Sequence, residues 1–142
     1  MAEEKKGFFA RWLEKNAEKI LQMIDTQLDE GEELEDWVYG QTAPNELLSW
    51  IPILDWIHSA GTKHYILCLT NKRFLAINTK GTSNKVKNTF AVPLSSVTSV
   101  EVSNRPLTAH LLVTMSNGKT TRYKELDREQ AATFAGQYET LT

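Results

Sequence analysis

Short runs rich in β-branched and aromatic residues, each followed by a turn signal, fill most of the chain after residue 62 and restrict its fold more than any other feature. Together with one earlier run they predict seven strands, at residues 33–41, 64–69, 73–78, 86–92, 97–103, 110–115 and 120–124. The connections suit hairpins, which indicates an antiparallel meander folded into a barrel or into two packed sheets.

Two dipeptides predict the tightest of these turns. Asn71-Lys72 lies between two apolar runs, and asparagine tolerates the positive φ of a tight hairpin turn. Asn117-Gly118 is a stronger signal, because both of its residues tolerate positive φ, and it predicts a two-residue type I′ turn.

These turns decide which residues face each other across each hairpin. The first turn predicts the pairs Cys68 with Leu75, Ile66 with Ile77, Leu69 with Phe74, and Leu67 with Ala76. The second predicts Leu112 opposite Tyr123, with Leu111, Val113 and Met115 on the reverse side. Both hairpins would then be apolar on both faces, whereas an antiparallel sheet normally keeps one face in water. We therefore expect an uncovered apolar patch that serves as an interface.

Helical patterns flank the strands. Apolar residues recur at steps of three and four between residues 7 and 30, which predicts an amphipathic helix ended by Gly31. Near the C-terminus, Asp127 with Gln130 three residues later predicts a capped helix over about 127–140. The predicted fold class is mainly β, at the border of all-β and α+β. It is a bent, seven-stranded antiparallel barrel capped by a C-terminal helix, with an extra N-terminal amphipathic helix.

The central strands resemble a known family. Residues 65–77 are similar to two consecutive strands of small bacterial pleckstrin-homology-like (PH-like) domains, relatives of GRAM domains, and residues 92–102 are similar to the segment that follows. Asn117-Gly118-Lys119 and the closing helix fall where the family has them. The resemblance covers residues 32–141. Together with the helical pattern before it and the apolar run within it, the resemblance divides the chain into an N-terminal helix at 1–31 and a PH-like domain at 32–142 with an apolar insertion at about 42–62. It also implies a non-catalytic interaction module, because the family shares no enzymatic activity and several members look self-assembling.

One departure from PH domains concerns lipid binding. Phosphoinositide-binding PH domains carry lysine and arginine around the connection between their first two strands, whereas residues 42–62 contain neither. A phosphate head group needs cationic donors at close range. We therefore expect no phosphoinositide site in this connection.

The connection contains an unusually apolar run over residues 47–57. Its large members are Leu47, Trp50, Ile51, Ile53, Leu54, Trp56 and Ile57. The run is too short to span a bilayer. Three interpretations remain open: a lid on the protein's own barrel, a surface between subunits, and an insertion into a membrane interface, where tryptophan is favoured. As a hypothesis, these residues form an interaction surface. In the membrane alternative, the basic loop Lys80, Lys85 and Lys87 contacts lipid.

Charge is unevenly distributed although the net charge is only −2. Residues 20–62 hold nine acidic and no basic residues, whereas residues 63–142 hold eleven basic and five acidic residues. If the fold keeps these two parts on separate faces, the surface is dipolar and suits association between copies. Basic residues spread over several strands do not form the stripe that nucleic-acid binding requires, so no nucleic-acid partner is expected.

Motifs for catalysis, cofactors and metals are not expected here. The chain has no Gly-rich phosphate loop, no Gly-x-Ser-x-Gly and no Cys-x-x-Cys, and its histidines, His58, His64 and His110, are scattered. Cys68 is the single cysteine, lies in an apolar run and cannot form an intrachain disulfide. We therefore expect a cytoplasmic, non-enzymatic module that forms a homo-oligomer or binds a protein partner, with peripheral membrane binding as the alternative.

Overall fold

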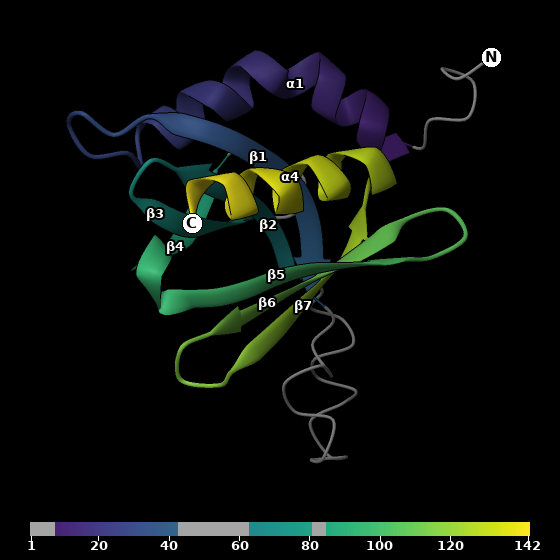
Figure 1. Ribbon diagram of the computed structural model, residues 1–142. Coiled ribbons are helices and arrows are strands. Elements are labelled where there is room, and N and C mark those ends of the chain that lie inside the picture. Colours follow the sequence, from purple (N-terminus) through teal and green to yellow (C-terminus); the bar gives the residue numbers. More distant parts are fainter. Residues whose placement is uncertain (1–7, 43–62, 81–84) are drawn as a thin grey trace, which may run out of the picture.

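The structure is a computed structural model that describes residues 8–42, 63–80 and 85–142 (Figure 1). Its elements in chain order are α1 (Phe8–Asp25), β1 (Leu34–Thr42), β2 (Lys63–Thr70), β3 (Arg73–Thr79), β4 (Val86–Pro93), the short 3-10 helix η2 (Leu94–Ser96), β5 (Val97–Asn104), β6 (Ala109–Met115), β7 (Thr120–Leu126) and α4 (Arg128–Leu141). The strands pair antiparallel in one seven-stranded sheet of order β4-β3-β2-β1-β7-β6-β5. The predicted mainly-β fold with flanking helices is confirmed.

The sheet bends where β1 meets β7, so its two halves enclose one core. In the described residues the register between these strands is the pair Gln41 and Lys124. Gly40 lies at this junction, and a Cβ atom there would come within 3.1 Å of Cδ1 of Leu126 and 3.3 Å of Cβ of Tyr123. Glycine at this position therefore allows the close approach that the bend requires.

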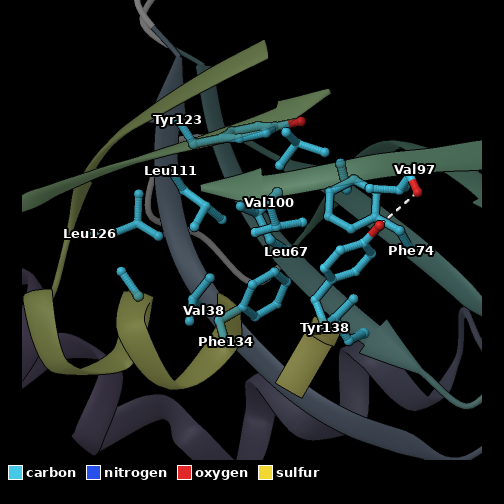
Figure 2. Packing of buried hydrophobic residues seen from close by; sticks show 14 of the residues in the cluster. Val38, Leu67, Phe74, Val97, Val100, Leu111, Tyr123, Leu126, Phe134 and Tyr138 are labelled. Carbon is cyan, nitrogen blue, oxygen red and sulfur yellow. Dashed lines mark hydrogen bonds between the residues drawn. The ribbon is translucent and has the colours of Figure 1, made fainter. Parts of the chain in front are cut away.

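Helix α4 covers the open side of the inner core (Figure 2). Its apolar residues Ala131, Phe134 and Tyr138 are buried against β-strand residues of both halves of the sheet. The Tyr138 hydroxyl donates a buried hydrogen bond of 2.7 Å to the carbonyl of Val97, which anchors the end of the helix to β5. Asp127 caps the helix as predicted, accepting a 3.0 Å hydrogen bond from the Gln130 N–H.

Helix α1 covers the outer face of the β1–β3 half. Ile20, Met23 and Ile24 of the helix are buried in a second cluster whose strand members are Tyr39, Ile66, Cys68, Leu75 and Ile77. The four predicted pairs of the β2–β3 hairpin are all confirmed. Both faces of this hairpin are therefore apolar, as expected, and within the protein one is covered by the inner core and the other by α1.

The β2–β3 turn differs from its prediction in one respect. Asn71 does not adopt positive φ. The hydroxyl of Thr70 accepts hydrogen bonds from the N–H groups of Lys72 (3.1 Å) and Arg73 (2.8 Å), and these bonds stabilise a turn without a left-handed residue.

The end of α1 also differs from its prediction. The helix ends at Asp25, because the following bonds, from Gln27 N–H to Ile24 and from Leu28 N–H to Asp25, span only three residues. Gly31 has φ of +80° but lies in the turn beyond the helix, so its assignment as the helix stop was wrong.

A buried ion pair fastens this turn to the β2–β3 hairpin. The side chain of Glu32 is fully buried, and its two oxygens accept bonds from Arg73 Nε at 2.9 Å and Arg73 Nη2 at 2.7 Å. Glu32 also accepts from the Thr70 hydroxyl at 2.6 Å and from the Asp29 N–H at 2.9 Å. The hydrogen bonds from Arg73 are the main reason that the pKa of Glu32 is lowered from 4.5 to about 2.

The β6–β7 hairpin has a longer turn than predicted. Asn117 does not adopt positive φ; Gly118 does, at +87°. The Gly118 N–H bonds the Met115 carbonyl at 2.9 Å, and the Met115 N–H bonds the Lys119 carbonyl at 2.8 Å. The loop is thus a turn followed by a glycine bulge rather than a two-residue type I′ turn.

The extra loop residue shifts the register of the hairpin by one position. Leu111 pairs with Tyr123, and Leu112 pairs with Arg122, so the predicted pair Leu112 with Tyr123 was wrong. Because side chains alternate between faces, this shift places Leu111 and Tyr123 in the core and Leu112 on the outer face.

The buried ion pair leads to a first prediction. Glu32→Gln should lower the free energy of unfolding by about 3 kcal/mol at neutral pH, because it leaves Arg73 without its buried carboxylate. Since folding lowers the pKa of Glu32, its stabilisation is present above pH 4.5 and is lost as the pH falls toward about 2. Urea unfolding between pH 7 and pH 2 measures this loss, and the exposed neighbour Glu30→Gln is the control. Equal stability of the two variants would contradict the assignment.

The bulge leads to a second prediction. Gly118→Val should destabilise the protein by about 1–2 kcal/mol, because a β-branched residue is strained at positive φ. No neighbouring atom lies within 4 Å of a Cβ at this position, so the cost comes from the backbone alone. Gly118→Asn is the matched control and should cost less, since asparagine tolerates this conformation. Thermal unfolding with unchanged midpoints for both variants would rule out the bulge.

Candidate interaction surfaces

The sequence-predicted surface residues divide into two groups. Leu47, Trp50, Ile51, Ile53, Leu54, Trp56 and Ile57 lie outside the described residues. The basic loop residues are described: Lys80 follows β3, Lys85 precedes β4, and Lys87 lies in β4, all three exposed. The Lys80 N–H donates a 3.1 Å hydrogen bond to the Lys85 carbonyl, which holds the two residues together at the base of the loop.

Another exposed lysine lies at the same end of the sheet. Lys63 begins β2, and its neighbour His64 pairs with Thr79, the residue that precedes Lys80. The structure thus gathers Lys63 with the basic loop.

Exposed acidic residues gather where α1 passes into β1. This acidic corner consists of Glu18, Asp25, Asp29, Glu30, Glu33 and Glu35. The nearby cation Arg73 is already bonded to Glu32 and lies 3.8 Å from Asp29. The corner therefore presents a negative surface.

A shallow apolar groove runs along α1 beside this corner. Its volume is about 480 Å³, and it is lined by the apolar residues Leu21, Ile24, Leu28 and Leu34 and by the polar residues Glu18, Gln22 and Asp25. Leu21 is 43% exposed, although it follows the buried Ile20. We call this feature the α1 groove.

Basic residues gather on the outer face of the β5–β7 half. This basic face consists of Arg105, His110, Arg122 and Lys124; the two strand cations flank the core residue Tyr123 and so point outward. Nη2 of Arg105 lies 3.5 Å from Nδ1 of His110. Partial burial, and then the charges of Arg105, Lys124 and Arg122, lower the pKa of His110. The permanent cations of this face are Arg105, Arg122 and Lys124, and the exposed Glu101 of β5 lies at its far edge.

The outer face of β5–β7 is polar, which corrects the sequence analysis. Leu112 lies between Glu101 and Arg122, and Thr114 pairs with Ser99 and Thr120. The expectation that this hairpin is apolar on both faces was wrong, because it rested on the two-residue turn.

Large apolar side chains are exposed at four described positions: Leu21, Val86, Phe90 and Leu107. Leu107 is the most exposed, at 90%. It lies in the β5–β6 turn beside Arg105, where the Arg105 N–H bonds the Thr108 carbonyl at 2.8 Å. The sequence analysis missed Leu107 and the α1 groove. An apolar residue directly after a turn proline, Pro106, was the available signal for Leu107.

Reactive side chains are engaged in structural contacts. The Tyr39 hydroxyl hydrogen-bonds Nδ1 of His64, and burial lowers the pKa of this histidine. Cys68 is buried, and burial raises the pKa of its thiol. Within the described residues, no group of three or more His, Cys, Asp and Glu side chains is arranged to hold a metal ion. His58 lies outside them.

None of the described helices is both long and apolar enough to span a bilayer.

Comparison with solved structures gives three matches, of which the first two exceed a TM-score of 0.5. The hSac2 domain from human phosphoinositide phosphatase Sac2 has 10% identity and a TM-score of 0.59, with 90% of this chain and 82% of that chain covered. The C-terminal domain of an unknown protein from Leishmania infantum has 14% identity and a TM-score of 0.52, with 89% and 98% covered. A DUF1696 family protein with a pleckstrin-homology domain from Shewanella loihica PV-4 has 22% identity and a TM-score of 0.42, with 72% and 94% covered.

Sequence comparison gives the family. No curated protein matches this chain. A family model described as Bacterial PH domain matches residues 13–137, a range that runs from within α1 through most of α4. The bent sheet and closing helix agree with the resemblance drawn from the central strands. The chain belongs to the bacterial PH domain family.

Proposed function

We propose that this bacterial PH domain is a non-catalytic interaction module that self-associates. The observation that carries the proposal is the separation of charge over the fold. The acidic corner lies at the α1–β1 connection, and the basic face lies on the outer side of β5–β7, across the barrel from α1 (Figure 1). Two copies can bring these unlike faces together, whereas one copy cannot join its own. Opposite charges of this kind orient two copies as they approach each other and disfavour other relative orientations of the copies.

A second contribution is proposed for the apolar run of residues 47–57. Trp50 and Trp56 are the kind of large side chain that supplies most of the energy at protein interfaces. The charged faces would then set orientation, and this run would supply buried apolar area. The proposal includes a cytoplasmic location, which suits a chain whose single cysteine is Cys68.

Self-association predicts a mass above that of one chain. Light scattering behind a sizing column, at tens of micromolar protein and low salt, should give a multiple of 16.1 kDa. High salt should lower the mass, because it screens the exposed charges. Trp50→Ser or Trp56→Ser should lower it as well, with Asn88→Ser, an exposed uncharged residue of β4, as the control. A single-chain mass for the wild type at low salt would refute self-association.

Peripheral membrane binding is the second candidate, and the grouping of Lys63, Lys80, Lys85 and Lys87 at one end of the sheet favours it. It predicts co-sedimentation with vesicles that contain phosphatidylserine and none with phosphatidylcholine alone. Lys85→Glu with Lys87→Glu should release the protein, since each lysine near an anionic surface contributes about 1 kcal/mol. Lys72→Glu, at the opposite end of β2, is the matched control. Absence of binding to both kinds of vesicle would eliminate this candidate, and equal binding to both would exclude a role for the lysines.

A further inference from the structure

The β5–β6 turn carries an apolar side chain that is not buried within its own chain. Leu107 is 90% exposed, and it lies in a four-residue connection closed by the bond from the Arg105 N–H to the Thr108 carbonyl. Pro106 restricts the backbone before it. The turn therefore holds an apolar tip beside the cation Arg105. We call residues 105–108 the knob.

The α1 groove has the complementary character. Its floor is apolar and its rim carries Glu18 and Asp25. Leu21 on its edge is 43% exposed and is thus available to contact an apolar side chain. The groove volume of about 480 Å³ accommodates a leucine side chain together with part of its turn.

The knob and the groove match in both polarity and charge. Leu107 would enter the apolar floor, while Arg105 would meet Glu18 and Asp25 on the rim. The rest of the basic face follows the knob, and Asp29 and Glu30 continue the acidic side. We propose that the occupant of the α1 groove is the β5–β6 knob of a second copy of this chain. This inference rests on the proposed self-association and specifies the surfaces that make it.

A single molecule cannot satisfy this contact internally. The knob projects from the right of the barrel in Figure 1, whereas the second half of α1 and the connection to β1 lie at the left. A two-fold contact of groove against groove is disfavoured, because it would place Glu18 and Asp25 against the same acids of the partner. Knob and groove are unlike surfaces, so the contact repeats from copy to copy.

Substitutions at the knob and the rim test the contact. Leu107→Ser should weaken association by about tenfold or more, since burial of one leucine contributes at least that much. Arg105→Glu and Asp25→Lys should each weaken association, and the two together in one chain should restore it. Lys119→Glu, on the exposed β6–β7 turn at the opposite end of β6, and Val86→Ser, an exposed apolar residue of β4, should leave the mass unchanged. Thermal unfolding of each variant shows that the domain still folds.

Cross-linking supplies a second measurement that depends on geometry. A chain with Leu107→Cys and Leu21→Cys should form a ladder of species larger than dimers under mild oxidation, because each copy offers one thiol to each neighbour. Each single-cysteine variant should stay largely uncross-linked, because its thiol faces a leucine of the neighbouring copy. Because the native Cys68 is buried, it should contribute little cross-linking of its own.

The outcomes separate the inference from the proposed function. A wild type that remains a single chain would refute both. A wild-type oligomer whose mass is unaffected by Leu107→Ser, with no ladder from the double-cysteine chain, would refute the knob and groove and leave self-association intact. Loss of association in Leu21→Ser but not in Leu107→Ser would show that another segment occupies the groove, and would also overturn the inference. Restoration by the Arg105–Asp25 exchange, with the ladder, is the expected result.

Discussion

The β2–β3 hairpin sets the main constraint on this protein, because both of its faces are apolar and neither can be left in water. On the inner side, Leu67 and Phe74 pack into the core that β5–β7 and α4 complete. On the outer side, Ile66 and Leu75 pack beneath α1. A PH-like barrel alone supplies the first cover, and the N-terminal helix supplies the second. The Glu32–Arg73 pair then fastens the turn that follows this helix to the hairpin that the helix covers.

The fold could be predicted from the sequence where local chemistry and hydrophobic pattern agreed. In the β2–β3 hairpin, apolar residues on both faces and a two-residue connection gave the correct register. In the β6–β7 hairpin, Asn117-Gly118 suits two kinds of turn, and the choice depends on packing outside the turn. Tyr123 and Leu111 share the core only if the loop contains one extra residue. Side chains alternate along a strand, so this single residue moved Tyr123 from the side of Leu112 to the side of Leu111.

The surfaces were less predictable, because each is assembled from residues that lie far apart in sequence. The uneven distribution of charge was visible in the sequence, but only the fold shows that the acidic corner and the basic face lie on different sides. The α1 groove depends on Leu34 of β1 lying beside Leu21 and Leu28. That contact follows from the turn that Glu32 closes, and no periodicity in the helix encodes it.

The open order of the sheet has a consequence for aggregation. Among the described strands, β4 has a neighbour on one side only, so the backbone groups of its other side form a free edge that an unrelated strand can extend. Phe90, which is 51% exposed on β4, adds apolar surface to this edge and so favours such pairing. The same strand carries Lys87, whose charge is costly to bury between strands, and ends in Pro93, which has no N–H to offer. These two residues act as gatekeepers, because they hinder the addition of an unrelated strand at this edge.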